Sequence, residues 1–150
     1  MKHFDRIFYR NAAALITAAT KGGTYPAYTI SGWIPLVGSV AAGAKIGLDA
    51  DAKDPMGDGT ELTVGEKIPV EITVKDFTAA NYATIRAAFL NKNVDVLFMD
   101  TNQPDVCYAA HGVKLYPKFD GTGGAEPMIV IAGERKCGSG LALFSPVAVS

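Results

Sequence analysis

Cysteine and histidine are the residue types of this chain best suited to metal binding or nucleophilic chemistry. Cys107 and His111 lie near each other in the sequence, whereas Cys137 and His3 lie elsewhere. No Cys-x-x-Cys or His-x-x-x-His pair is present, so the spacing does not predict a zinc site. A regular strand would hold Cys107 and His111 about 13 Å apart, too far for a histidine to activate a thiol. The sequence leaves open whether the two cysteines pair.

An acidic segment spans residues 49–61. Its carboxylates are those of Asp49, Asp51, Asp54, Asp58 and Glu61. Lys53 stands where an EF-hand loop would need a ligand, and no flanking helices are predicted. We interpret the segment as a solvated loop, and cation binding by it stays open.

Two glycine-containing motifs are also poor candidates for catalysis or nucleotide binding. The run Gly121–Gly124 lacks the Lys-Ser/Thr ending of a phosphate-binding loop and joins two predicted strands, which indicates a hairpin turn. Ser139 lacks the Gly-x-Ser-x-Gly pattern of a hydrolase nucleophile. We therefore predict that the chain is not an enzyme, with no catalytic, cofactor-binding or metal-binding residue.

Composition indicates one folded domain over residues 1–150. The chain is 49% hydrophobic, only 19% charged and carries a formal net charge of -1. A soluble domain typically has about 25% charged residues, so part of the surface is expected to be covered by something else. The near-neutral balance disfavours a polyanion binder. Two cysteines and no apolar run after the first charged residues favour a reduced, intracellular setting.

The segment 22–44 carries no charged side chain. Pro26, Pro35 and several glycines interrupt it, so it does not predict a membrane-spanning helix. We interpret it as a long apolar arm or loop that packs either on its own domain or on a neighbouring copy. The second option makes its larger apolar residues candidates for a subunit interface: Tyr25, Tyr28, Ile30, Trp33, Ile34, Leu36 and Val37.

The rest of the chain predicts a mainly β (α+β) fold. Apolar residues alternate with polar ones over 68–74, which indicates a half-buried strand. Residues 78–91 predict a helix, with Thr78 as N-cap. The segments 94–99, 106–115, 128–132 and 141–149 have strand character and are divided by turns. This spacing favours an antiparallel β-sandwich or barrel with one flanking helix. The segment 11–20 is compatible with either helix or strand.

The order of these elements resembles the tail-tube proteins of tailed bacteriophages, which are similar to the tube protein of type VI secretion. The resemblance is carried by Lys67–Phe77, Thr78–Asn91, Val94–Met99, Val113–Pro117 and Met128–Glu134, about half of the chain. It implies a virion protein assembled in the host cytoplasm, whose subunits form rings, hexameric in that family, that stack into a hollow tube. DNA would then be only passing cargo, and other virion proteins would be partners. The arm 22–44 or the loop 49–60 would reach the adjacent subunit or ring.

Two alternative functions stay open. A capsid-decorating or head-completion protein of similar β architecture would bind preformed shells and make no tubes alone. A small-ligand-binding or enzymatic β-barrel would use a cavity lined by Tyr108, His111 and Tyr116.

Overall fold

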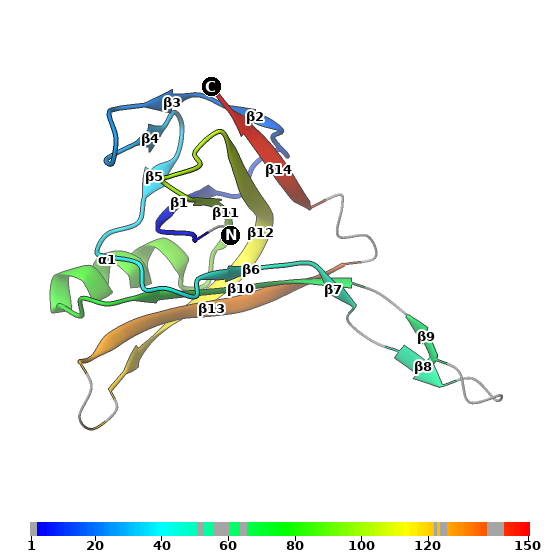
Figure 1. The fold of residues 1–150 in the computed structure, drawn as a ribbon. Coiled ribbons are helices and arrows are strands. Elements are labelled where there is room, and N and C mark those ends of the chain that lie inside the picture. Colours follow the sequence, from blue (N-terminus) through cyan, green and yellow to red (C-terminus); the bar gives the residue numbers. More distant parts are fainter. Residues whose placement is uncertain are drawn as a thin grey trace.

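The computed structural model describes residues 3–50, 53–55, 61–63, 66–121, 123, 126–137 and 143–150. Within these residues the chain is mostly β, with antiparallel sheets and one helix, α1 (Ala79–Phe89), as the sequence predicts (Figure 1). The strands are β1 (Arg6–Asn11), β2 (Ala18–Ala19), β3 (Lys21–Gly22), β4 (Thr29–Ile30), β5 (Ile34–Pro35), β6 (Lys45–Ile46), β7 (Asp49–Ala50), β8 (Lys53–Pro55), β9 (Glu61–Thr63), β10 (Glu66–Val74), β11 (Asn93–Met99), β12 (Val106–Asp120), β13 (Met128–Cys137) and β14 (Phe144–Val149).

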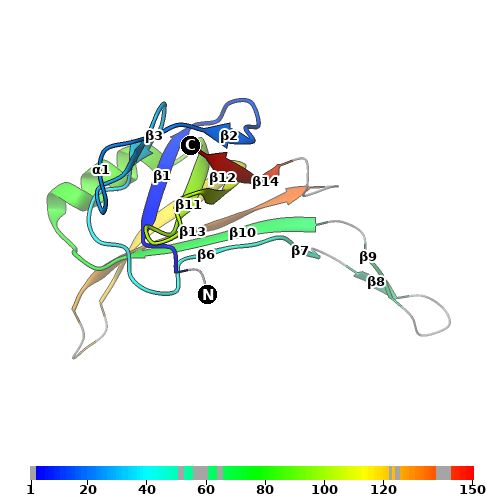
Figure 2. The same cartoon turned by 45° about the horizontal axis from the view of Figure 1, so that its top comes forward.

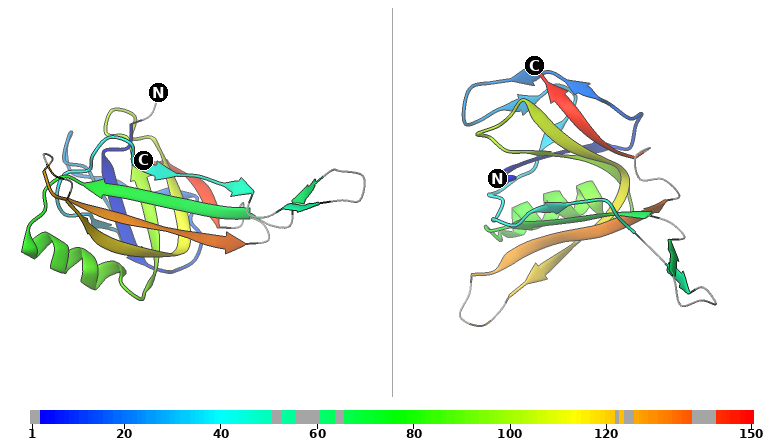
Figure 3. Two further views of the ribbon diagram at one scale, coloured as in Figure 1. Left: turned by 90° about the horizontal axis from the view of Figure 1, so that it is seen from below. Right: turned by 45° about the vertical axis from the view of Figure 1, so that its right-hand side comes forward.

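The long strand β12 connects two halves of one sheet, whose order is β5-β1-β11-β12-β13-β10-β6. One half, which we call the β11 half-sheet, contains β5, β1, β11 and the first part of β12. Residues 106–110 of β12 also pair with β14 on this side. Residues 115–120 pair with β13 and belong to the β10 half-sheet, together with β10, β6 and β7. The two halves fold over each other (Figures 1 and 3). The described strands form no closed barrel, so the expected sandwich or barrel takes the form of an open sheet that folds over itself.

The main core lies between the two half-sheets and α1. Strand β11 contributes Val94, Val96 and Phe98 to it, while its other face carries Leu97 and Met99. Because both faces of β11 are covered, this strand is apolar almost throughout instead of alternating with polar residues. The other side chains of this core include Ile68, Val70, Ile72 and Val74 of β10, Leu115 of β12, Ile129 and Ile131 of β13, and Ile85 and Phe89 of α1.

Helix α1 forms where the alternation of β10 stops. The Thr78 hydroxyl accepts a hydrogen bond from the Asn81 amide at 3.1 Å and so satisfies one of the unpaired donors of the first turn. The buried face of the helix consists of Ile85 and Phe89, which lie one turn apart. Asn91 follows the helix with a φ of 58°, the left-handed conformation that asparagine tolerates.

The segment 22–44 wraps around the protein as a strap instead of extending away from it (Figures 1 and 2). Its β5 pairs with β1, and further along Val40 forms a bridge to Val74 at the end of β10. The Ala41 amide also donates to the Thr73 carbonyl at 2.7 Å. The strap therefore covers the outer face of the β11 half-sheet and reaches the β10 half-sheet.

Candidate functional site

A β-bulge at His111 and Gly112 forms the corner at which β12 leaves one half-sheet for the other. The register between β11 and β12 shifts between Val94 and Val96, so that the two residues of the bulge lie opposite Asp95 alone. Gly112 has a φ of 66°, a conformation that glycine adopts without a steric penalty. A bulge of this kind bends a strand sharply, which allows β12 to serve both half-sheets.

Asp95 is fully buried behind this corner and holds it in place. Its carboxylate accepts hydrogen bonds from the Gly112 amide at 2.8 Å, the Ala13 amide at 3.0 Å and the Arg10 guanidinium at 2.9 Å. The guanidinium group of Arg10 also lies over the Trp33 ring, with its central carbon 4.4 Å from the ring centroid. The carboxylate thus ties together β11, the corner of β12 and the end of β1, and Arg10 links this group to the strap.

The electrostatic environment favours the charged form of Asp95. Burial raises the pKa of this carboxyl, but its neighbours outweigh burial and hold the pKa below its ordinary value. These neighbours are the His111 imidazole, the amides of Gly112 and Ala13, and the Arg10 guanidinium. His111 Nδ1 lies 3.4 Å from Asp95 Oδ2, and neither ring nitrogen has a hydrogen-bond partner within the described part of the chain.

Replacing Gly112 with alanine is expected to destabilise the corner. The added Cβ would collide with the Arg135 guanidinium, which donates to the His111 carbonyl at 3.0 Å, and the positive φ would strain the backbone. We expect a loss of about 1–3 kcal/mol in the free energy of unfolding, measured by urea denaturation.

Gly43→Ala is the matched control, because Gly43 also has a positive φ but faces open space. Gly43→Ala therefore measures the backbone strain alone. The loss in unfolding free energy is expected to be about 1 kcal/mol larger for Gly112→Ala, which is the net value of one hydrogen bond. Equal losses would mean that the contact between Arg135 and the corner contributes nothing.

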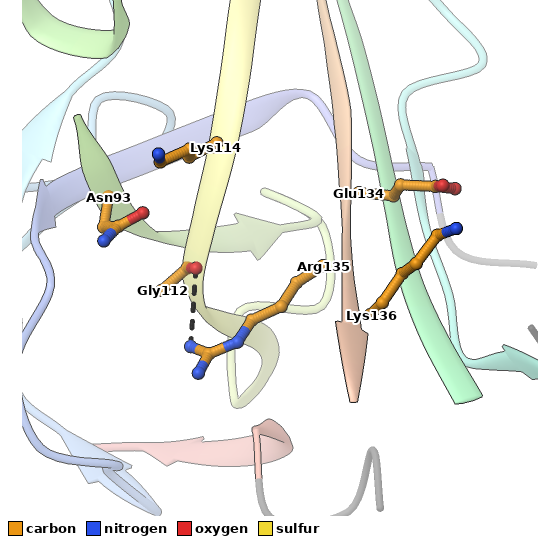
Figure 4. A pocket seen from close by; sticks show the side chains of 6 residues that line it. All are labelled: Asn93, Gly112, Lys114, Glu134, Arg135 and Lys136. Carbon is orange, nitrogen blue, oxygen red and sulfur yellow. Dashed lines mark hydrogen bonds between the residues drawn. The ribbon is translucent and has the colours of Figure 1, made fainter. Parts of the chain in front are cut away.

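A basic cavity lies in the fork where β12 and β13 separate. The ladder between these strands ends at the pair Leu115–Gly133, although β13 continues to Cys137. The cavity has a volume of about 320 Å³. Figure 4 shows its lining residues: Asn93, Gly112, Lys114, Glu134, Arg135 and Lys136. Arg135 reaches across the fork to the bulge, while the side chains of Lys114 and Lys136 are exposed. With three cations and one carboxylate, the cavity is suited to an anionic group.

The structure divides the candidate interface residues of the strap into two groups. Ile30, Trp33 and Leu36 are buried against their own chain, Ile30 and Trp33 on the outer face of the β11 half-sheet and Leu36 in the main core. In a single folded chain these three side chains offer no surface to a neighbour. For these three residues the structure shows the first of the two alternatives, packing on their own domain, and the subunit interface on the strap stays a prediction.

The remaining strap residues keep some exposure. Tyr25 and Ile34 are 62% and 53% exposed, respectively. Tyr28 and Val37 are half-buried and pack at the margins of the two cores. A subunit interface on the strap would consist mainly of Tyr25 and Ile34.

The acidic segment belongs largely to a hairpin that stands away from the body. Strands β8 and β9 pair only with each other among the described strands and form a separate two-stranded sheet. The hairpin is rooted where Ala50 of β7 pairs with Glu66 of β10, and it projects beyond that end of the sheet (Figures 1 and 3). Residues 51–52, 56–60 and 64–65 lie outside the described residues, so the expectation of a solvated acidic loop applies partly to them.

The residues considered for metal binding or nucleophilic catalysis have separate environments. The Cys107 thiol is buried and donates to the Pro104 carbonyl at 3.7 Å, whereas His111 lies beside Asp95. The His3 amide donates to Asp100, and the side chain of Cys137 lies outside the description. Within the described ranges, no cluster of three or more histidine, cysteine or acidic side chains could hold a metal ion.

The three residues considered for a ligand cavity do not converge. Tyr108 lines a cavity of about 290 Å³ together with Phe4, Ile46 and Phe144. His111 is buried at the corner, and Tyr116 is exposed on β12. This arrangement gives the ligand-binding alternative no common site.

Sequence reasoning missed the residues that build the corner and the fork. Asp95 is a charged residue inside the apolar run 94–99, and a strand buried on both faces carries such a residue only with partners. Gly112 interrupts a strand pattern, which often marks a bulge. Both signals are present in the sequence, but neither identifies Arg10 or Arg135 as the partner.

Two further observations bear on function. In the part of the chain that the structure describes, no helix has the length and apolar character needed to cross a membrane. Comparison with protein-family models, curated proteins and solved structures finds no match.

Proposed function

We propose that this chain is a virion structural subunit that associates with copies of itself, in the manner of a tail-tube protein. The element order that resembles that family supports the proposal, and so does the position of the β8–β9 hairpin. In this proposal the subunits form a ring, hexameric by the resemblance, and rings stack into a tube in the virion after assembly in the host cytoplasm. The role is structural, so no residue is assigned to catalysis.

The β8–β9 hairpin is the observation that carries the proposal. An isolated two-stranded hairpin is marginally stable in water, because it has no third strand or helix to cover it. Its strands are paired with each other and with no other described strand of the same chain. A hairpin that extends from the body in this way would gain stability by packing on another molecule. In a self-assembling protein, that molecule would be a second copy of the chain.

Exposed apolar side chains add support for contacts between copies. Apart from Tyr25 and Ile34 on the strap, Tyr116 and Phe119 are each more than half exposed near the tip of the β12–β13 hairpin. Single exposed apolar residues are common. In a chain that is only 19% charged, these four side chains are candidates for contacts with other copies.

Shortening the hairpin is expected to abolish assembly and preserve the fold. Residues 51–65 would be replaced by Asn-Gly, a two-residue turn suited to connecting the paired residues Ala50 and Glu66. The purified chain is expected to form rings or tubes at high concentration, and the shortened chain to stay monomeric with unchanged strand content. Negative-stain electron microscopy, sedimentation velocity and circular dichroism measure these outcomes.

The matched control shortens the turn of the other long hairpin, replacing residues 121–127 between β12 and β13 by Asn-Gly. This variant keeps Tyr116 and Phe119 and is expected to assemble. A full-length chain that stays monomeric at every concentration would contradict the proposal. A full-length chain that binds preformed capsids but makes no rings would favour the capsid-decorating alternative, and ligand binding by a strict monomer would favour a ligand-binding barrel.

A further inference from the structure

A second cavity lies between the end of β1, the strap and α1, and has a volume of about 340 Å³. In Figure 1 the strap passes from β5 toward α1, which brings these three elements together. Arg10, Asn11 and Lys92 contribute polar groups to the cavity. Among the described residues that line it, none is acidic, whereas Glu134 lines the fork.

The edge of β1 is open beside this cavity. The Ile7 carbonyl accepts a hydrogen bond from the Leu36 amide of the strap, and two residues later Tyr9 pairs with Ile34. Alternate residues of an antiparallel strand bond to the same neighbour, so Asn11 also directs its amide toward the strap. The pairing between β1 and β5 ends at Tyr9. Within the described strands, the Asn11 amide therefore has no partner on this side and is available to a ligand.

The cavity carries one uncompensated positive charge. Asp95 neutralises Arg10, whose Nε and Nη2 donate to the Asp95 carboxylate and the Ala14 carbonyl. The remaining terminal nitrogen of Arg10, Nη1, has no hydrogen bond to the part of the chain that the structure describes. Lys92 is exposed, and no described acidic side chain forms an ion pair with it. An anion in the cavity would thus meet the charge of Lys92 and a free donor of Arg10.

Two neighbouring groups could offset this charge, but neither does so fully. The C-terminal end of a helix carries about half a negative charge, and α1 ends beside the cavity. The Leu90 amide donates to the Arg86 carbonyl, and the Lys92 amide donates to the Phe89 carbonyl. These bonds satisfy part of the helix end, so the full charge of Lys92 outweighs it. Burial raises the pKa of Tyr9, so its hydroxyl adds no negative charge at neutral pH.

The cavity also has apolar walls, which limit the kind of anion it can hold. Ile34 of the strap is 53% exposed and forms one wall, while Ala87 and Ala88 of α1 form another. The volume is near the lower end of the roughly 300–1,000 Å³ found for ligand pockets, so the occupant is small. A single uncompensated charge matches a monovalent carboxylate better than a phosphate dianion.

We propose that the cavity between β1, the strap and α1 binds a carboxylate group attached to a short aliphatic chain. The carboxylate interacts with the Lys92 ammonium group, Arg10 Nη1 and the Asn11 amide. The aliphatic chain packs against Ile34 and Ala87. A small free acid and the C-terminal residue of an apolar peptide share this chemistry. The inference goes beyond the proposed function and does not depend on assembly.

Saturation-transfer NMR of hexanoate mixed with the full chain tests the proposal, in monomeric and assembled samples alike. We expect a Kd of about 1 mM, which is typical of a ligand of this size. The neutral analogue hexanamide is expected to bind about threefold more weakly, because it cannot form an ion pair. Lys92→Gln is expected to weaken hexanoate binding to a similar extent, and Lys92→Arg to retain it. Lys75→Gln, at an exposed lysine outside the cavity, is the control and is expected to bind like the wild type.

Filling the cavity provides a second test. Ala87→Leu places an aliphatic side chain of the protein itself in the cavity and is expected to abolish hexanoate binding. Ala83→Leu, one turn earlier on α1 and outside the cavity, is the matched control and is expected to leave binding unchanged. Leucine is a good helix former and both alanines are exposed, so circular dichroism is expected to show an unchanged fold.

The outcomes decide the proposal and the source of the carboxylate. No binding of hexanoate, equal binding of hexanamide, or wild-type binding by Ala87→Leu would each overturn it. Tighter binding of N-acetyl-Ala-Leu than of hexanoate would identify a peptide C-terminus as the source, and weaker binding a free acid. Rings formed by a chain that does not bind hexanoate would overturn this inference and leave the proposed function intact.

Discussion

Replacing Asp95 with alanine is expected to lower the free energy of unfolding by about 3–5 kcal/mol. The substitution leaves the Arg10 guanidinium without its carboxylate partner and leaves the amides of Ala13 and Gly112 without an acceptor. Removing one partner of a buried, hydrogen-bonded charge pair costs more than the pair contributes, because the remaining groups stay desolvated. Urea denaturation followed by circular dichroism measures the loss.

Asp120→Ala provides the control for this substitution. Asp120 is exposed near the tip of the β12–β13 hairpin, so its loss is expected to change stability by no more than about 0.5 kcal/mol. A similar small effect for Asp95→Ala would mean that the corner of β12 is held by packing alone.

The contribution of Asp95 is also expected to depend on pH, with a definite sign. Its pKa in the folded chain lies below its ordinary value, so the unfolded chain binds the proton first as the pH falls. The stabilisation is therefore complete above about pH 5 and decreases as the pH falls below about 4. Comparing the unfolding free energies of the wild type and Asp95→Asn between pH 3 and 7 measures it. A difference that grows toward acidic pH would contradict the assignment.

Replacing Trp33 with alanine is expected to cost about 3–5 kcal/mol of stability. The indole is only 7% exposed, packs with Phe8 and Leu97 on the outer face of the β11 half-sheet, and lies against the charge of Arg10. Its removal would open a cavity and expose the ion pair between Arg10 and Asp95 to water, so we expect cooperative unfolding at a lower urea concentration.

The neighbouring residue Ile34 supplies a matched control for Trp33. It lies on the same strap but is 53% exposed, so Ile34→Ala is expected to change stability by no more than about 0.5 kcal/mol. If Trp33→Ala left stability unchanged but impaired assembly, Trp33 would belong to a contact between copies. The two substitutions thus separate the part of the strap that holds the fold from the part available to a neighbour.

Much of the fold could be predicted because it depends on local patterns. The alternation at 68–74 corresponds to the core of β10, and the capping residue Thr78 begins α1 as predicted. The strands after the helix were also predicted, although β12 extends to Asp120 and β13 to Cys137, beyond the expected ends at Leu115 and Ala132. The end of a strand depends on its partner, and here the antiparallel pairing with β13 continues to the pair Asp120–Met128.

The candidate site was much less accessible to prediction. The sequence predicts a loop for the acidic segment and gives no sign of the fork, whose cations come from β12 and β13. Lys114 and Lys136 are separated by more than twenty residues, and both line the fork because the pairing of β12 with β13 brings their segments side by side. For the strap, the sequence shows the apolar residues but does not show which surface covers them.

The sequence by itself determined which segments become strands and which becomes a helix, because the spacing of apolar residues and the capping groups act between residues close in the chain. It also determined that the chain has few charges and an acidic segment. Only the tertiary structure decided that Asp95 meets Arg10, that Trp33 is covered by its own chain, and that β12 and β13 separate to form a basic fork. These are contacts between residues far apart in the sequence, and periodicity shows that a face must be covered without specifying which element covers it.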